Sequence, residues 1–264
     1  MVISLWQLII LTLLAFIAII DDLSLALGIG KPLIVGAITG FVMGDIQMGM
    51  AVGATLQLMI LGVGTYGGAS IPDYMTGAIV GTVFAILSGE GLEFGIGLAV
   101  PVGLLMVQLD VLARFSNVFF QKRIENAIND FNFKSVSLNT WLGALPWGLS
   151  RAIPVFLTLS FGQNLVDVVL DYAPDWLMGG LSVAGGLLPA VGLAILLRYL
   201  PTVDNIHYLI IGFFLAAYIE VPMIGVALVG FAMAILAYKN LSVSTSNITN
   251  NLSQGGILDG EYED

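Results

Sequence analysis

The chain has 264 residues, of which 58% are hydrophobic and only 10% are charged, with a formal net charge of −10 at pH 7. A soluble domain normally carries roughly 25% charged residues, so this composition excludes a water-soluble globule, and the acidic balance argues against nucleic acid as a partner. The chain has no cysteine and one histidine, His207, which excludes disulfides, thiolate chemistry and multi-histidine sites. We expect no metal ion and no cofactor.

Long charge-free stretches are the clearest pattern in the sequence. A membrane-spanning helix needs about 20 mostly apolar residues, and four stretches are long enough, at residues 2–20, 46–72, 176–197 and 221–238. Shorter or interrupted apolar stretches, at residues 33–44, 76–88, 94–109, 141–158 and 209–219, suit half-membrane or re-entrant pieces. The pattern predicts an all-α polytopic membrane protein with roughly 6–9 membrane segments, including re-entrant or broken helices.

The first apolar stretch, residues 2–20, lacks the basic start of a signal peptide and is followed by Asp21 and Asp22. A first helix that is retained is therefore favoured over a cleaved signal peptide.

Polar sequence divides the chain into four parts. Residues 1–113 form a first hydrophobic half, and residues 114–140 form a basic loop that holds half of all Lys and Arg and is expected in the cytoplasm. Within it, residues 115–131 are predicted to form an amphipathic helix, which is either a solvated linker or a dock for a cytoplasmic partner. Residues 141–239 form a second hydrophobic half, and residues 240–264 are predicted to be a disordered acidic tail.

Glycine is concentrated within the apolar stretches. Gly36, Gly40 and Gly44, and then Gly49 and Gly53, are spaced as GxxxG, which predicts close packing of helices. Residues 62–77, GVGTYGGASIPDYMTG, hold too many glycines for a regular helix although apolar sequence flanks them. Because irregular backbone at membrane depth is buried in protein or lines a wet cavity, we favour a substrate-binding loop over an exposed turn.

Several polar side chains in or beside this loop suit a sugar, which needs many hydrogen-bond donors and acceptors. The candidates are Gln57, Thr65, Tyr66, Ser70 and Asp73. Gln57 alternatively bonds a neighbouring helix, and Asp73 alternatively caps the helix that follows it.

Other ionisable residues interrupt apolar sequence. Lys31 and Asp45 are secondary candidates for the site. Asp45, Asp110 and Glu220 are conceivable members of a proton relay, but no regular spacing links them. For His207, an interfacial position is favoured over a phosphorylated or proton-shuttling role.

At these residues the sequence resembles a known family. The run KPLIVGAITGFVMGDIQMGMAVGATLQLMILGVGTYGGASIPDYMTGAI, with Lys31-Pro32-Leu33-Ile34, Gly44-Asp45 and Pro72-Asp73, resembles the membrane IIC component of the mannose, fructose and sorbose family of bacterial sugar phosphotransferase systems. Arg151-Ala152-Ile153-Pro154 and Val183-Ala184-Gly185-Gly186 extend the resemblance over nearly all of residues 1–238.

The resemblance implies a sugar-translocating subunit of the bacterial plasma (inner) membrane that works with a IID membrane subunit. Cytoplasmic IIA and IIB proteins would relay phosphate from phosphoenolpyruvate to the sugar, so no catalytic residue is expected in this chain. We also expect a higher oligomer. The alternatives are an ion- or proton-coupled secondary transporter acting alone and a scaffold or receptor subunit that transports nothing.

Two departures bear on the sugar. Gln57 stands where the family usually has Glu, and Val63-Gly64-Thr65-Tyr66 stands where mannose and sorbose members carry a Trp-Met-Asn run. The later run LSVAGGLLPAVGLAILLR is nearer the branch that takes N-acetylgalactosamine and galactosamine. A neutral Gln57 would suit an uncharged or acetylated ligand.

Overall fold

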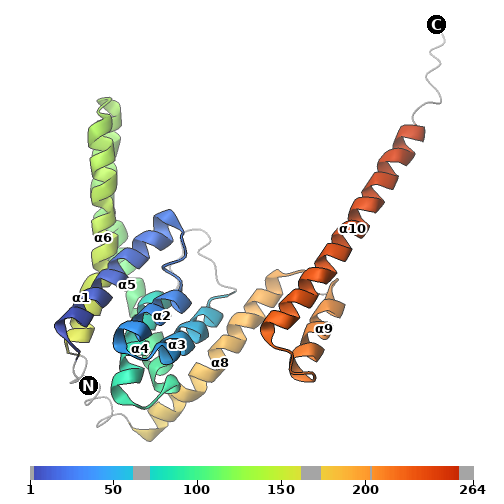
Figure 1. The fold of residues 1–264 in the computed structure, drawn as a ribbon. Helices are drawn as coiled ribbons and strands as arrows, with labels where there is room; N and C mark the ends of the chain where they lie inside the picture. The colour runs from blue at the N-terminus through green and yellow to red at the C-terminus, as the bar shows by residue number, and fades with distance from the viewer. Residues whose placement is uncertain (1–2, 62–71, 162–173, 203, 256–264) are drawn as a thin grey trace. The chain divides into compact units, whose positions relative to one another are not determined.

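The computed structural model describes residues 3–61, 72–161, 174–202 and 204–255. Every regular element within these ranges is a helix (Figure 1), which confirms the predicted all-α class. The chain divides into two compact units, Met1–Tyr199 and Leu200–Asp264. Each unit is described by itself below.

Three helical segments in the described ranges are long and apolar enough to cross a membrane. The first is α1 (Leu5–Ile20) with a π-helical turn, η1 (Asp21–Leu25), which gives a segment of 21 residues. The others are α5 (Leu92–Asn129) and α6 (Phe133–Ser160). The first apolar stretch is thus a helix, and it packs against α6.

Three helices of the first unit are too short to span a bilayer. They are α2 (Pro32–Met43), α3 (Ile46–Met59) and α4 (Tyr74–Ser88), with 12, 14 and 15 residues. At 1.5 Å per residue they measure roughly 18–22 Å, against about 30 Å of hydrocarbon. The charge-free stretch at residues 46–72 is therefore not one continuous helix, because α3 ends at Met59 and α4 begins after Asp73.

Glycine brings α2 against α3. A Cβ atom added at Gly36 would collide with the backbone oxygen of Gly49, and one added at Gly49 would collide with that of Gly36. The same reciprocal contact joins Gly81 of α4 to Gly95 of α5. The contact between α2 and α3 confirms the close packing that the GxxxG spacing predicts. Residues of α2 and α4 also belong to one buried core.

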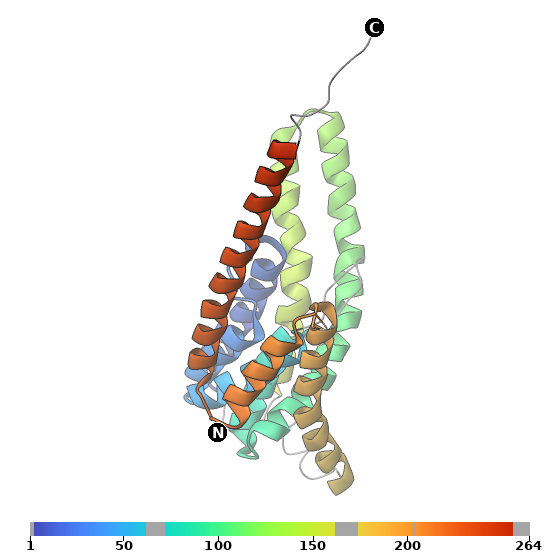
Figure 2. The ribbon, with the colours of Figure 1, turned by 90° about the vertical axis from the view of Figure 1, so that its right-hand side faces the viewer.

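The basic segment at residues 114–140 is a helical hairpin rather than a loop. α5 continues to Asn129, the chain turns through Phe131 at φ 52°, and Asn132 caps α6 by accepting from the Ser135 N–H at 3.2 Å. The two green helices run side by side in Figure 2. The helix predicted over residues 115–131 is present as far as Asn129.

The last helix of the first unit, α8 (Asp175–Tyr199), packs against α3 and α5. The second unit consists of α9 (Ile206–Ala217) and α10 (Met223–Gly255), which pack on each other. α10 continues through residues 240–255, where composition predicted disorder. No Gly or Pro interrupts residues 231–254, and adding a residue to an existing helix costs far less than starting one.

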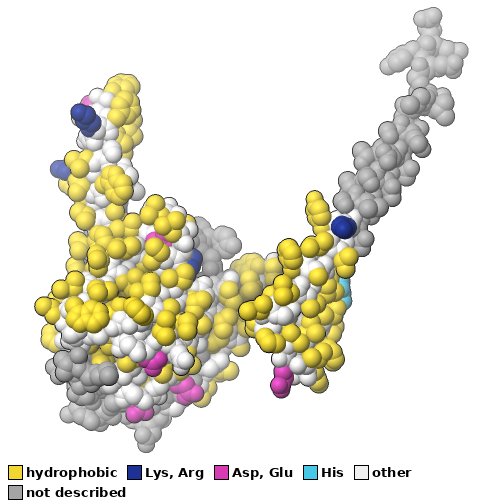
Figure 3. Space-filling view, in the orientation of Figure 1, with side chains coloured by type: hydrophobic (Ala, Val, Ile, Leu, Met, Phe, Trp, Pro, Cys, Tyr) yellow, Lys and Arg dark blue, Asp and Glu magenta, His cyan; other side chains and the backbone are white. Residues whose placement is uncertain are grey.

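Apolar side chains cover much of the visible surface of each unit (Figure 3). Phe41 and Trp141 of the first unit are both 75% exposed. So large an apolar surface is typical of contact with lipid or with partner helices.

Candidate functional site

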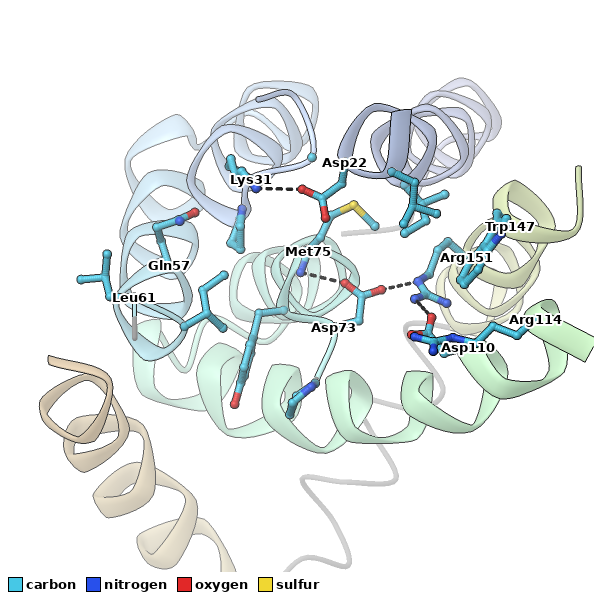
Figure 4. Close-up of a pocket in the computed structure, with 17 residues that line it drawn as sticks. Asp22, Lys31, Gln57, Leu61, Asp73, Met75, Asp110, Arg114, Trp147 and Arg151 are labelled. Carbon is cyan, nitrogen blue, oxygen red and sulfur yellow. Dashed lines mark hydrogen bonds and ion pairs between the residues drawn. The ribbon is translucent and has the colours of Figure 1, made fainter. Parts of the chain in front are cut away.

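The first unit contains a cavity of ≈ 510 Å³ at the meeting point of its helices. Its wall combines η1, the start of α2, the end of α3, the start of α4, and the middle of α5 and α6 (Figure 4). Small-molecule sites usually measure about 300–1,000 Å³. Three of the residues predicted from the sequence, Lys31, Gln57 and Asp73, line this one cavity.

Asp73 stands at the first turn of α4. Its Oδ1 accepts hydrogen bonds from the backbone N–H groups of Met75 at 3.1 Å and Thr76 at 3.2 Å, and its Oδ2 accepts one from the Thr76 hydroxyl at 2.7 Å. The helix-capping role that the sequence allowed is therefore present. The same Oδ2 also forms an ion pair with Nε of Arg151, so Asp73 does more than cap the helix.

Arg151 is the most deeply buried cation of the cavity wall. Its side chain is 3% exposed, and it reaches from α6 to two carboxylates, with Nε toward Asp73 and Nη2 donating to Oδ1 of Asp110 on α5. Its Nη1 also donates to the Ser150 hydroxyl at 3.1 Å. Arg114, one turn after Asp110, lies 3.9 Å from the other oxygen of that carboxylate.

A second ion pair borders the cavity. Nζ of Lys31 lies 2.8 Å from Oδ1 of Asp22, with side chains 53% and 44% exposed. The neighbouring Asp21 is only 2% exposed and accepts from the backbone N–H groups of Leu27, Gly28 and Gly30 at 2.8, 3.0 and 3.1 Å. Asp21 thereby fixes the turn that places Lys31 at the cavity.

Gln57 lies on the cavity wall near the end of α3. Its Oε1 atom is buried and has no hydrogen-bond partner among the described residues. In the view of Figure 4, Gln57 and Arg151 lie on either side of Asp73. A buried acceptor without a partner is uncommon and calls for an explanation, and a ligand that donates a hydrogen bond supplies one.

The remaining predicted residues fall elsewhere. Asp45 caps α3 by accepting from the Met48 N–H at 2.9 Å, and it is not among the described residues that line the cavity. Thr65, Tyr66 and Ser70 lie outside the described residues. Within the described ranges, no three metal-ligating side chains gather.

The sequence-based site omitted several residues of the wall. Arg151 and Asp110 could have been named as site residues from the sequence, because a charged residue within an apolar segment is a functional candidate by default. Asp22 and Arg114 stand at the ends of apolar stretches, where charge is ordinary. Trp147, which also lines the cavity, is one of four tryptophans, and no pattern distinguishes it from the others.

A family model described as the sorbose-specific IIC component of a PTS system matches residues 5–236. The chain is 31% identical to N-acetylgalactosamine permease IIC component 1 of Escherichia coli K12 over 87% of this chain and 86% of the relative. It is 28% identical to the mannose-specific EIIC component of the same strain, covering 88% and 89% of the two chains. It is 29% identical to the fructose permease IIC component of Bacillus subtilis 168, covering 85% and 84%.

Two solved structures resemble the fold. One, described as a membrane protein, has a TM-score of 0.79 at 27% identity and covers 90% of this chain and 96% of its own. The other is a chain of the mannose transporter ManYZ in complex with microcin E492, with a TM-score of 0.59 at 27% identity, covering 90% and 97%.

Proposed function

Because the chain belongs to the family of sorbose-type IIC components of the bacterial sugar phosphotransferase system, we propose that it forms a sugar path across the inner membrane. It carries a hexose or amino sugar inward together with a IID subunit, and IIB phosphorylates the sugar. The multi-pass helical fold and the inner-membrane location follow from the family and from the apolar helices.

The proposal rests on one observation: Oε1 of Gln57 is buried and has no hydrogen-bond partner among the described residues. A sugar hydroxyl or acetamido N–H is a donor that satisfies this oxygen. Lys31 and Asp22 offer a donor and an acceptor on the same cavity, and Trp147 offers an aromatic face for the C–H side of a sugar ring. Asp73 completes the proposed lining, and we place Thr65, Tyr66 and Ser70 at the same site from the sequence.

We favour N-acetylgalactosamine as the sugar. The described charges of the wall are paired with one another, Lys31 with Asp22 and Arg151 with Asp73 and Asp110. A neutral acetylated sugar leaves these pairs intact, whereas a cationic amino sugar would compete for their carboxylates. The 31% identity to an N-acetylgalactosamine permease component supports this choice.

The IID partner is proposed from the resemblance to a chain of ManYZ. The phosphate relay is assigned to IIA and IIB because the chain has no cysteine and a single histidine. His207 belongs to the second unit, at the start of α9, where its ring lies against Tyr208.

Uptake of labelled sugars tests the proposal. Cells that express this chain with its IID subunit and the IIA and IIB proteins would be given N-acetylgalactosamine, mannose, fructose and sorbose. We expect N-acetylgalactosamine to accumulate as its phosphate and to require phosphoenolpyruvate. Uptake that needs no phosphocarriers and collapses with a proton uncoupler would instead establish a coupled secondary transporter.

A further inference from the structure

Both oxygens of the Asp73 carboxylate are already engaged. A carboxylate offers about four acceptor positions, and Asp73 uses its two oxygens for two backbone N–H groups, the Thr76 hydroxyl and Arg151. Its backbone N–H also donates to the Gly103 carbonyl of α5 at 3.0 Å. The start of α4 is thus held to α5 by backbone and to α6 by Arg151.

Arg151 joins three helices through one guanidinium. It binds Asp73 at the start of α4 and Asp110 on α5 from its own position on α6, with side-chain exposures of 3%, 10% and 14% for Arg151, Asp73 and Asp110. In Figure 4 these three side chains form a continuous chain along one side of the cavity. A lysine has one compact ammonium group, which cannot present a planar fork to two carboxylates.

The contacts from Asp110 through Arg151 to Asp73 hold a segment that forms part of the cavity wall. Pro72, Asp73, Tyr74 and Met75 are consecutive lining residues at the start of α4. If Arg151 were neutral, Asp73 would keep its capping bonds. The start of α4 would then keep its backbone hydrogen bond to Gly103 of α5 and lose its connection to α6, whereas Gln57 on α3 and Lys31 at the N-cap of α2 would keep their positions.

From this geometry we propose that Arg151 and Asp110 are positioning residues for the sugar site. Asp110 holds the guanidinium, the guanidinium holds the Asp73 carboxylate, and the start of α4 thereby keeps the shape that binds sugar. The proposal rests on the proposed function, because it assigns roles within the same cavity. Asp110 acts through Arg151, so its effect on sugar binding depends on Arg151 being present.

A double-mutant cycle on the full chain co-expressed with IID tests this dependence. Equilibrium binding of whichever labelled sugar of the four-sugar panel the wild type accumulates would be measured in membranes. The variants are Arg151→Met, Arg151→Lys, Asp110→Asn and the double variant Arg151→Met with Asp110→Asn. Glu125→Gln, an exposed carboxylate on the same helix as Asp110, is the matched control.

We expect Arg151→Met and Asp110→Asn each to weaken binding about tenfold, within the range that coupled neighbours show. The double variant should bind no more weakly than Arg151→Met, Arg151→Lys should fall between wild type and Arg151→Met, and Glu125→Gln should bind as wild type. Thermal unfolding of the same samples separates affinity from the amount of folded protein. If Arg151→Met does not fold, Arg151→Lys provides the comparison.

Three results decide the outcome. Wild-type affinity in a folded Arg151→Met variant, or in Arg151→Lys where the former does not fold, would overturn the positioning role. Losses that multiply in the double variant would also overturn it, because Asp110 would then act on the sugar independently of Arg151. A wild type that takes up no sugar of the panel would overturn the proposed function itself.

Discussion

The backbone N–H of Gly30 donates a hydrogen bond to the buried carboxylate of Asp21, nine residues earlier in the chain, at 3.1 Å. Together with the N–H groups of Leu27 and Gly28 it encloses that carboxylate. The carboxylate organises the turn between η1 and α2, immediately before Lys31.

Replacing Asp21 by Asn should therefore destabilise the protein. The amide keeps one acceptor oxygen but turns an NH2 group toward backbone donors, and hydrogen bonds to charged groups contribute about 1.5–3 kcal/mol each. We expect Asp21→Asn to lower the free energy of unfolding by about 2 kcal/mol or more, measured by denaturation in detergent. The adjacent Asp22→Asn removes only an exposed ion pair and should cost about 1 kcal/mol or less. Equal losses at the two positions would contradict this account.

A methyl group between α2 and α3 should also be costly. Gly49→Ala places Cβ against the Gly36 backbone oxygen, and overpacking of this kind costs about 1–3 kcal/mol. Gly212→Ala in α9 is the control, because nothing lies within 4 Å of its added Cβ. Thermal unfolding should show a lower midpoint for Gly49→Ala alone, and an unchanged midpoint there would argue against the close packing.

Gln57→Ala should weaken sugar binding by about tenfold, the equivalent of 1.4 kcal/mol, and leave thermal stability nearly unchanged. The reason is that its buried oxygen has no partner within the described residues whose loss would destabilise the fold. Gln121→Ala removes an exposed carboxamide from α5 and should leave binding at the wild-type value. Binding isotherms for the two variants check the comparison, and full affinity in Gln57→Ala would remove Gln57 from the site.

Thr82→Val should leave stability unchanged or raise it by about 1 kcal/mol. Thr82 is fully buried in α4, and its hydroxyl oxygen has no partner among the described residues. Valine has the same shape and needs no hydrogen bond, so the substitution removes the cost of burying a polar group. Unfolding curves provide the measurement, and a clear loss of stability would show that the hydroxyl does have a partner.

The hairpin of α5 and α6 should face the cytoplasm, because it carries Arg114, Lys122, Arg123 and Lys134. Since the chain has no cysteine, a single Lys122→Cys variant reports its side of the membrane without background. An impermeant maleimide should label it in inside-out vesicles and leave it unlabelled in intact cells. Ala78→Cys, at a fully buried position of α4, should resist labelling in both, and labelling of Lys122→Cys in intact cells would reverse the orientation.

The helical class followed from the sequence because apolar stretches leave few alternatives in a membrane. The boundaries of the individual helices were harder to predict from the sequence. Residues 114–140 read as a loop because they are polar, yet a polar segment between two spanning helices can continue both of them. The start of the tail read as disordered for the same reason, although α10 extends through it to Gly255.

For the site, the polar residues beside the glycine-rich segment directed attention to Gln57 and Asp73, and the structure brings these two to one cavity. The contacts that connect Asp73 to α6 could not be predicted, because Arg151 meets Asp73 and Asp110 from another helix, and it is 41 residues from Asp110 in the sequence. No local spacing encodes such a pairing. It arises only when α4, α5 and α6 have packed together.

The short lengths of α2, α3 and α4 bear on the energetic barrier to transport. A polar solute that crosses an intact bilayer loses its hydration over about 30 Å of hydrocarbon. In the proposed sugar path, helices this short would end within that thickness and bring polar backbone and the charged side chains around Asp73 into it, where such groups are tolerated beside a water-filled cavity. In the sugar path that we propose, the dehydrated part would therefore be shorter than the membrane, and a smaller displacement of helices would expose a bound sugar to the other side.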